Sequence, residues 1–480
     1  MSFISLTFLE FFPLVVLLFF LLPHKFRWFV LLTASCIFYM AFIPQYILVL
    51  LFTIVIDYFA AIVIETLPQA NRKKWLILSI IANIGVLAIF KYYNFFLDNF
   101  RLTAILPVLK LALPIGLSFH TFQAIAYTTE VYRGNQKAER HFGIYALYIL
   151  FFPQLVAGPI ERPQNMLHQF HEKKTFNYRN AVTGLRLILW GFFKKIVIAD
   201  RLGIVTDYVY NAPGNYSSWA LVTASFFFAF QIYCDFSGYS DIALGTARMM
   251  GFRLMRNFNF PYQSHSLVEF WTRWHISLST WFRDYVYIPL GGNRVHPAKW
   301  YCIILFVFIL SGFWHGPNWT FIAWGTLNGI YILLEKITKK YRHAFIRFIK
   351  WENTFPATCL YIISTFLFIL TGWVFFRAKN MDDALAILYK QKSLFPDLMN
   401  AVFHHKSLIG IAGVKKKELI LCVLLILGVY VSEIIISKNP FNGFYLPSKR
   451  PFRLAIYYII IALIILTGVF EKRGFIYFQF

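Results

Sequence analysis

Long runs of apolar side chains recur from one end of this chain to the other, and they constrain its fold more than any other feature. A helix needs about 20 apolar residues to cross the roughly 30 Å hydrocarbon core of a membrane. The runs therefore predict an all-α, multi-pass transmembrane helical bundle with about ten to twelve crossings. They are Phe11–Leu22, Ile47–Ile64, Leu76–Phe90, Ala181–Phe193, Val222–Ile232, Tyr301–Phe313, Cys359–Phe376, Leu419–Val431 and Leu454–Val469.

Several of these runs are too short to span, and we expect them to be re-entrant or buried segments. No basic region precedes the first run and no small-residue cleavage site follows it, so we expect it to remain as a helix. The chain has 480 residues, 59% of them hydrophobic, and no stretch has the composition of a soluble domain. We therefore expect one membrane domain over residues 1–480.

The middle of the chain differs from its flanks in composition. Residues 106–335 are dense in Gly, Pro, Trp, His and Arg close to apolar runs. Irregular backbone at membrane depth is tolerated only where it is buried in protein or lines a water-filled cavity. We therefore expect 106–335 to be the functional core, with N-terminal helices over 1–105 and C-terminal helices over 336–480 as its scaffold.

The charge of the chain also points to a membrane. The formal net charge is +24, from 46 Lys and Arg residues against 22 Asp and Glu. The basic residues cluster in short loops, as in the cytoplasmic loops of membrane proteins, so we expect lipid headgroups and no nucleic acid as partners. The five cysteines lie far apart, without metal-ligand spacing, so no metal site is expected. The main basic clusters are 72–74, 336–350 and 449–453.

Three of the twelve histidines stand in or beside apolar segments: His120, His275 and His315. An ionisable side chain inside a membrane is costly and by default marks a functional site. These three are therefore candidate site residues. The other nine lie in polar or loop-like sequence, where a solvated or interfacial side chain is expected: His24, His141, His168, His171, His265, His296, His343, His404 and His405.

His315 follows an apolar run and precedes a Gly-Pro break. Basic residues flank 300–334 on both sides, which predicts a helical hairpin that enters the membrane and returns. Its first arm, Trp300–Phe313, has 14 residues, which rise only about 21 Å. His315 is then expected within the membrane at a helix end, where backbone groups are free. A purely structural histidine, packed by neighbouring tryptophans at the break, fits these residues as well.

Aromatic residues in the segment 269–294 recur at spacings of three and four, which predicts one face of a continuous amphipathic helix. His275 and Ser279 flank this stripe, and Arg273 lies on the opposite face. Such a helix would lie at the membrane interface or line a wet cavity. The stripe itself is more typical of packing than of a substrate platform. It consists of Trp271, Trp274, Leu278, Trp281 and Tyr285.

Two carboxylates, Asp235 and Asp241, stand near the end of an apolar run. Paired intramembrane carboxylates are compatible with ion coupling in a transporter, and equally with bridging an arginine or capping a helix. The chain has no GxxxxGK[ST] motif and no GxGxxG after a strand, so ATP-driven work is not expected.

Buried histidines without metal or nucleotide motifs suit acyl transfer to a hydroxyl. An alcohol is a poor nucleophile at neutral pH, and a positioned imidazole can take its proton during attack. Helix ends, or Trp and Arg side chains, can steady the oxyanion that forms.

Eight motifs, densest over 110–330, resemble the membrane-bound O-acyltransferase (MBOAT) superfamily, and within it the bacterial alginate O-acetyltransferase branch. Glu130 stands where this family would carry Asp, which preserves the charge. The motifs are "LPIGLSFHTFQ", "TEVYRG", "FFPQLVAGPIERP", "YCDFSGYSDIALG", "RNFNFPY", "SLVEFWTRWHISLSTWFRDYVYIPLGG", "LSGFWHGPNWTFIAWGTLNG" and "FIYFQF".

The resemblance implies a helical bundle with a central tunnel, with 106–335 as its catalytic core. It implies that His315 is catalytic and that His275 is a second catalytic-site residue. Residues near them in sequence or in the shared motifs become candidates for substrate binding. These are Trp314, Trp274, Arg273, Ser279, Asp235, His120 and Asn318.

The resemblance also implies a reaction. An enzyme of this kind takes an acetyl group from a cytoplasmic thioester, acetyl-CoA or another acyl thioester, and passes it across the bacterial inner membrane to an exported polysaccharide such as alginate. Its expected partners are a periplasmic SGNH-type acetyltransferase and polysaccharide export machinery. The alternatives are D-alanyl or other acyl transfer to an envelope polymer, lipid or protein, and a polysaccharide or lipid transporter.

Overall fold

The computed structural model describes residues 1–156, 158–352, 354–403, 411, 413–437, 450–470 and 474–476. Within these ranges the chain is helical, and its one β-bridge, between Ile411 and Val414, is isolated. The predicted all-α class is therefore confirmed. His404 and His405 fall outside these ranges, as do the last four residues of the sequence.

Seven described helices are long and apolar enough to cross a membrane, which confirms the multi-pass membrane class. Large apolar side chains face outward on them: Leu48, Phe52 and Phe59 are each more than half exposed, which suits contact with lipid tails. The expected ten to twelve crossings stay a prediction. The seven are Pro44–Thr66, Gln69–Asn99, Ser218–Met249, Pro297–His315, Phe355–Arg377, Lys416–Ser437 and Arg450–Thr467, and Leu6–Leu21 and Phe142–Leu155 are shorter apolar helices.

The described structure divides into two compact units, and each is described by itself. Unit 1 comprises Met1–Phe192 and Tyr239–Asn257, and unit 2 comprises Phe193–Gly238 and Phe258–Phe480. The expected single domain, with its functional core over 106–335, stays a prediction.

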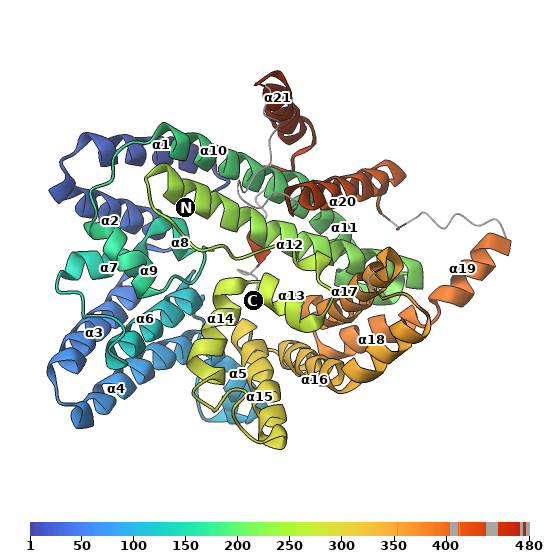
Figure 1. Ribbon diagram of the computed structural model, residues 1–480, viewed down its shortest axis with the longest axis horizontal. Coiled ribbons are helices and arrows are strands. Elements are labelled where there is room, and N and C mark those ends of the chain that lie inside the picture. Colours follow the sequence, from blue (N-terminus) through green and yellow to red (C-terminus); the bar gives the residue numbers. More distant parts are fainter. Residues whose placement is uncertain are drawn as a thin grey trace. The chain divides into compact units, whose positions relative to one another are not determined.

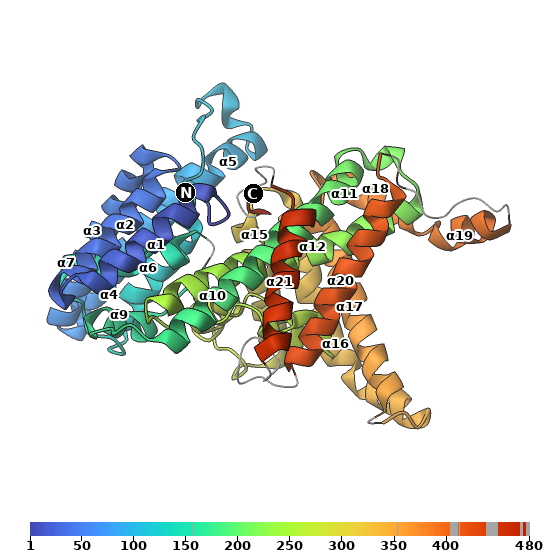
Figure 2. The same cartoon turned by 90° about the horizontal axis from the view of Figure 1, so that it is seen from above.

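Unit 1 contains the helices α1 (Leu6–Leu21), α2 (His24–Met40), α3 (Ile47–Thr66), α4 (Gln69–Leu87), α5 (Tyr93–Asn99), α6 (Leu117–Tyr132), α7 (Phe142–Leu150), α8 (Phe152–Leu155), α9 (Pro163–His171) and α10 (Tyr178–Phe192), with short 3₁₀ and π turns at Pro44–Tyr46, Ala88–Tyr92 and Leu102–Ala104. Helices α3, α4 and α6 pack on one another, and α2 packs on α1 and α7 (Figure 1 and Figure 2).

A buried polar cluster joins three helices of unit 1. The carboxylate of Asp57 on α3 accepts hydrogen bonds from Ser79 at 2.6 Å and Asn83 at 2.9 Å, both on α4. The Ser79 hydroxyl also lies 3.0 Å from that of Thr128 on α6. Because buried polar groups need partners, this cluster fixes the register of the three helices.

Unit 2 contains α11 (Asp200–Asn211), the larger part of α12 (Ser218–Met249), α13 (Leu267–Arg273), α14 (Ile276–Phe282), α15 (Pro297–His315), α16 (Trp319–Phe348), α17 (Phe355–Arg377), α18 (Met381–Gln391), α19 (Leu394–Phe403), α20 (Lys416–Ser437) and α21 (Arg450–Thr467). Shorter 3₁₀ and π turns lie at Phe193–Ala199, Pro213–Asn215, Pro261–Gln263 and Arg283–Tyr287.

Helices α15 and α16 form a hairpin whose arms meet through two glycines. A methyl group on Gly312 would lie 2.3 Å from the carbonyl oxygen of Phe321, and one on Gly325 would lie 2.3 Å from that of Phe308. Small residues at such a contact let two helix backbones approach closely. This contact determines where the end of α15, and hence His315, is held.

The first arm of this hairpin is longer than the sequence predicted. Helix α15 has 19 residues, from Pro297 to His315, and the side chain of His296 caps its start. Such a helix rises about 28 Å, close to the thickness of the hydrocarbon core. The predicted 14-residue arm was therefore wrong, and so was the argument from arm length that placed His315 at partial depth. The apolar run is shorter than helix α15 because the helix continues through polar residues as far as its cap.

We expect the substitution Gly312→Ala to lower the stability of the protein, because the added methyl group overlaps the backbone of α16. Overpacking of this kind costs about 1–3 kcal/mol. The measurement is the thermal unfolding midpoint in detergent. Gly428→Ala is the matched control, because Gly428 on α20 has open space at this position. Equal midpoints for the two variants would contradict the proposed close contact.

Candidate active site

His275 stands at a corner between the short helices α13 and α14. Side-chain hydrogen bonds fix the start of α13: Ser266 Oγ, at the N-cap, accepts a hydrogen bond from the amide of Glu269 at 3.0 Å, and the Glu269 carboxylate accepts one from the amide of His265 at 2.7 Å. Helix α13 ends at Arg273, and His275 then adopts φ 43° and ψ 56°. A residue other than glycine takes this left-handed conformation only where its surroundings hold it.

The corner shows that the continuous helix predicted from the aromatic stripe over 271–285 was wrong. Trp271 lies before the corner and Trp281 after it, so they do not belong to one helical stripe. The helical spacing of the aromatic residues suggested one helix because a single left-handed residue breaks a helix without changing the number of residues between them. Beyond α14, Gly291 and Gly292 form a turn, with φ values of 115° and 55°.

The imidazole of His275 is only 1% exposed. The ring of Phe236 on α12 packs edge-on against it, with 4.6 Å between ring centroids. Both residues belong to unit 2, so the part of α12 that lies in this unit helps to enclose the histidine.

His315 is the last residue of α15 and is 6% exposed. Three aromatic rings pack edge-on around its imidazole. The centroids of Trp314, Trp324 and Phe376 lie 4.9, 5.0 and 5.1 Å from that of His315. These rings come from α15, α16 and α17, so three helices fix the orientation of this side chain.

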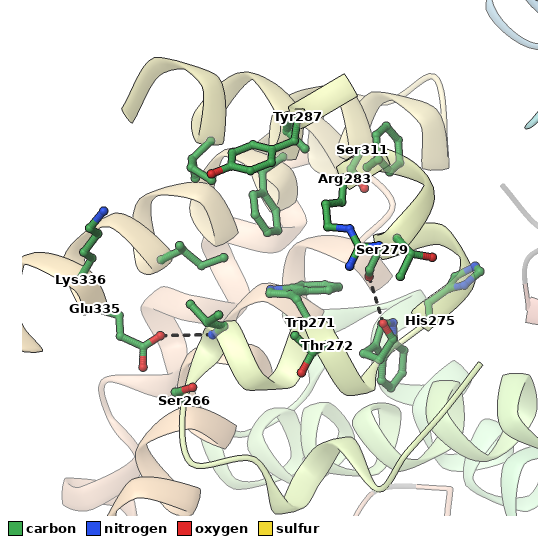
Figure 3. A pocket seen from close by; sticks show the side chains of 18 of the residues that line it. Ser266, Trp271, Thr272, His275, Ser279, Arg283, Tyr287, Ser311, Glu335 and Lys336 are labelled. Carbon is green, nitrogen blue, oxygen red and sulfur yellow. Dashed lines mark hydrogen bonds between the residues drawn. The ribbon is translucent and has the colours of Figure 1, made fainter. Parts of the chain in front are cut away.

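His275 and His315 line the same cavity, which has a volume of about 1100 Å³. Figure 3 shows part of its wall, with His275 on the corner after α13 and Ser311 on α15. Trp274 and Ser279 line it too. The cavity therefore brings together four of the nine candidate residues, all within unit 2. Its role as the predicted tunnel stays a prediction.

Three further candidates are near wall residues in sequence but do not line the cavity. Trp314 packs on His315. Arg273 forms an ion pair with Glu269 at 2.5 Å. Asn318 caps α16 by accepting a hydrogen bond from the amide of Thr320 at 2.9 Å. The side-chain contacts of these three therefore support the helices that carry the site.

The last two candidates lie elsewhere. Asp235 on α12 forms a buried ion pair with Lys195 at 2.5 Å and does not line the cavity. His120 belongs to unit 1, where its Nε2 lies 2.6 Å from the hydroxyl of Thr53 on α3. The sequence made both residues candidates because they are ionisable groups in or beside apolar runs and stand in motifs that resemble the family. Neither feature distinguishes a residue of the cavity wall from one that forms a buried bond.

The sequence reasoning missed a basic end of the cavity. Lys336, Lys339, Arg342 and His343 line it from one face of α16. Arg283, just after α14, also lines the cavity but lies away from Lys336 (Figure 3). From the sequence, we expected the cluster 336–350 to be a cytoplasmic basic loop that sets membrane topology, and His343 to be a solvated side chain. The helical spacing of these cations, at three and four residues, was the available signal that they share one face.

A second set of contacts joins α16 to the start of α13. The carboxylate of Glu335 accepts hydrogen bonds from the amides of Leu267 at 3.0 Å and Val268 at 3.3 Å. Figure 3 shows the Glu335 side chain directed toward α13. The neighbouring Lys336 places its ammonium 3.5 Å from the ring centroid of Trp300 on α15. Helix α16 therefore fixes both the beginning of α13 and the cationic wall beside it.

His275 lies outside the seven helices that are long enough to span a membrane. Burial lowers the pKa of its imidazole from 6.5 to about 3. The side chain is therefore neutral at physiological pH, the form that accepts a proton. Among the described residues, no group of three or more His, Cys, Asp or Glu side chains forms a metal site.

We expect the stability of the protein to fall with acid in part because of His275. Between pH 6.5 and about 3 the unfolded chain binds a proton at this residue that the folded chain does not, so this stability is complete above 6.5 and is lost as pH falls. The measurement is the slope of melting temperature between pH 7 and pH 5. We expect it to be shallower in His275→Asn, since Asn tolerates the left-handed backbone. An unchanged slope, equal to that of the exposed control His168→Asn, would contradict this.

Comparison with known proteins identifies the family of the chain. Residues 139–381 match the model of the MBOAT, membrane-bound O-acyltransferase, family. A peptidoglycan O-acetyltransferase of Helicobacter pylori is 41% identical over 387 residues, covering 75% of this chain and 72% of that protein. A "probable alginate O-acetylase AlgI" of Azotobacter vinelandii is 38% identical over 387 residues, covering 78% and 74%. A teichoic acid D-alanyltransferase of Bacillus subtilis is 30% identical over 284 residues, covering 55% and 69%. The chain belongs to the membrane-bound O-acyltransferase family and is an O-acyltransferase embedded in the membrane.

Proposed function

We propose that the protein takes an acetyl group from a cytoplasmic thioester, acetyl-CoA or another acyl thioester, and moves it across the membrane for O-acetylation of an exported polysaccharide such as alginate. It works in the bacterial cytoplasmic membrane. Its partners are a periplasmic SGNH-type acetyltransferase and the polysaccharide export machinery.

The observation that carries this proposal is a cavity that is lined by His275 and His315 at one part of its wall and by cations at another. Acetyl-CoA, the first of the proposed donors, carries phosphate groups. Lysine and arginine side chains are the ones that bind phosphate by charge-assisted hydrogen bonds. The basic end therefore suits the phosphates of the donor, and the largely apolar wall suits its thioester arm.

In this proposal His315 acts as the general base. Its imidazole removes the proton from the acceptor hydroxyl while the hydroxyl oxygen attacks the thioester carbonyl. The carbon–sulfur bond then breaks, and the proton passes to the departing sulfur. A thioester and an alcohol thus give an ester and a thiol. His275, neutral and lining the same cavity, supports the base by accepting hydrogen bonds from the substrates.

A wall residue that the sequence assigned to packing is suited to steady the oxyanion. The indole N–H of Trp271 is buried and has no hydrogen-bond partner among the described residues, and the residue lines the cavity. Its ring packs on Trp324, which in turn packs on His315. A preorganised donor in a site of low polarity stabilises a developing negative charge strongly.

The names of the relatives support a glycan acceptor without choosing among glycans. One is called a peptidoglycan O-acetyltransferase and others are called probable alginate O-acetylases. D-alanyl transfer to an envelope polymer is the second candidate, because a teichoic acid D-alanyltransferase is also similar. The mass added to the purified polymer distinguishes an acetyl from a D-alanyl ester.

We expect His315→Ala to reduce acyl transfer at least about 100-fold, because the acceptor hydroxyl loses its base. The measurement is incorporation of labelled acetyl groups from acetyl-CoA into polysaccharide by membranes that contain the full chain. Protein abundance in the membrane is measured alongside. His168→Ala, which changes an exposed histidine of unit 1, should transfer at the rate of the wild type. Full transfer by a folded His315→Ala variant would overturn the catalytic role.

We expect Trp271→Phe to lower kcat about 10-fold to 100-fold while leaving the KM for the donor nearly unchanged. The substitution keeps an aromatic ring and removes the indole N–H, which in this proposal donates a hydrogen bond to the oxyanion. The same transfer assay, run over a range of acetyl-CoA concentrations, measures both constants. Trp351→Phe, just beyond the far end of α16, is the matched control. A change confined to KM would assign Trp271 to donor binding instead.

A further inference from the structure

The segment Gly474–Ile476, near the end of the sequence, is built into unit 2. Phe475 is completely buried and Ile476 is nearly so. The amide of Ile476 donates a hydrogen bond to the carboxylate of Asp235 on α12, at 2.7 Å. A segment that lies 241 positions away from Asp235 in sequence is therefore held on α12 by one charge-assisted hydrogen bond and one buried ring.

The carboxylate that holds this segment is itself fixed. Lys195 lies 2.5 Å from Asp235 and 2.7 Å from Asp200, and all three side chains are at least 96% buried. The single ammonium of Lys195 thus forms an ion pair with both carboxylates, and a buried charge requires such a partner. Asp235 therefore has a defined position and direction, and the amide of Ile476 meets a rigid acceptor.

The residue next to Asp235 connects this anchor to the cavity. Phe236 packs on Phe475 on one side, with ring centroids 5.5 Å apart. On another side it packs edge-on against the imidazole of His275 at 4.6 Å. The backbone of His275 is in the left-handed region, a conformation that persists only when neighbouring groups enforce it. Phe236 is one such neighbour, and Phe475 limits where its ring can move.

We propose that the segment Gly474–Ile476 is a positioning element of the active site, which holds His275 in the cavity wall through Phe236. Asp235 and Lys195 anchor the segment, and Phe475 transmits that position to the ring of Phe236. Asp235, predicted to bind substrate, is on this view a positioning residue. The catalytic consequence rests on the proposed function of His275, whereas the positioning itself does not.

The experiment measures the accessibility of His275 directly. Diethylpyrocarbonate modifies neutral imidazoles that solvent can reach, and peptide mass spectrometry gives the rate at each histidine. We expect Phe475→Ala to raise the modification rate of His275 at least about fivefold over the wild type, because the corner opens locally. The rate at His315, measured in the same sample, should stay unchanged. The protein is the full chain in detergent at neutral pH.

Two further variants separate positioning from loss of packing. Phe475→Leu keeps an apolar side chain against Phe236 and should restore most of the protection of His275. Phe227→Ala removes a similarly buried ring from α12 and should leave His275 protected. Wild-type protection of His275 in Phe475→Ala overturns the proposal. A second result also overturns the proposal: both Phe475→Ala and Phe227→Ala expose His275 and His315 together. That result would show that loss of a buried ring loosens the packing in general.

Acyl transfer in the same variants tests the connection to catalysis. If Phe475→Ala exposes His275 and lowers kcat with little change in KM, the segment positions a residue that takes part in transfer. If His275 becomes exposed while kcat stays at the wild-type value, the positioning stands and the supporting role proposed for His275 is wrong. The two proposals therefore fail in different ways.

Discussion

The contact of Gly312 with α16 is the interaction on which the geometry of the site most depends. It lets the backbones of α15 and α16 come into contact. Helix α15 then ends at His315, whose imidazole packs against three aromatic rings. From the same helix α16, Glu335 holds the amides that start α13, and α13 ends at the corner of His275. One helix therefore sets the position of both histidines, although they are 40 residues apart in sequence.

Much of the fold class followed from the sequence, because long apolar runs leave a chain few alternatives to a helical membrane protein. The prediction was weaker where one residue changes the path of the chain. The left-handed backbone of His275 leaves the spacing of the aromatic residues intact, so the break had no signature in their periodicity. The length of α15 was underestimated for a related reason, since polar residues extend a helix as far as its cap.

The candidate site was predictable in its two histidines and less so in its surroundings. His275 and His315 stood out because imidazoles are rare in apolar sequence, and both line the cavity. Asp235 stood out by the same argument, yet it is neutralised by Lys195, a partner that no local pattern identifies. The cations on α16 were visible but had a sufficient explanation in membrane topology. A polar side chain in an apolar segment is therefore a group that needs a partner. Only the fold determines whether that partner is a substrate or another side chain.

The division of the chain has a consequence for its synthesis. Unit 1 is discontinuous: Tyr239–Asn257 returns to it after residues 193–238 have entered unit 2. The returning part contacts the first segment of unit 1, since the hydroxyl of Tyr239 lies 3.1 Å from that of Ser2 and the amide of Met255 donates to the buried Glu161. A ribosome must therefore release the beginning of unit 2 before unit 1 can close. The first 192 residues are an unfinished unit at that moment, and the order in which the helices leave the translocation machinery becomes part of how the protein acquires its fold.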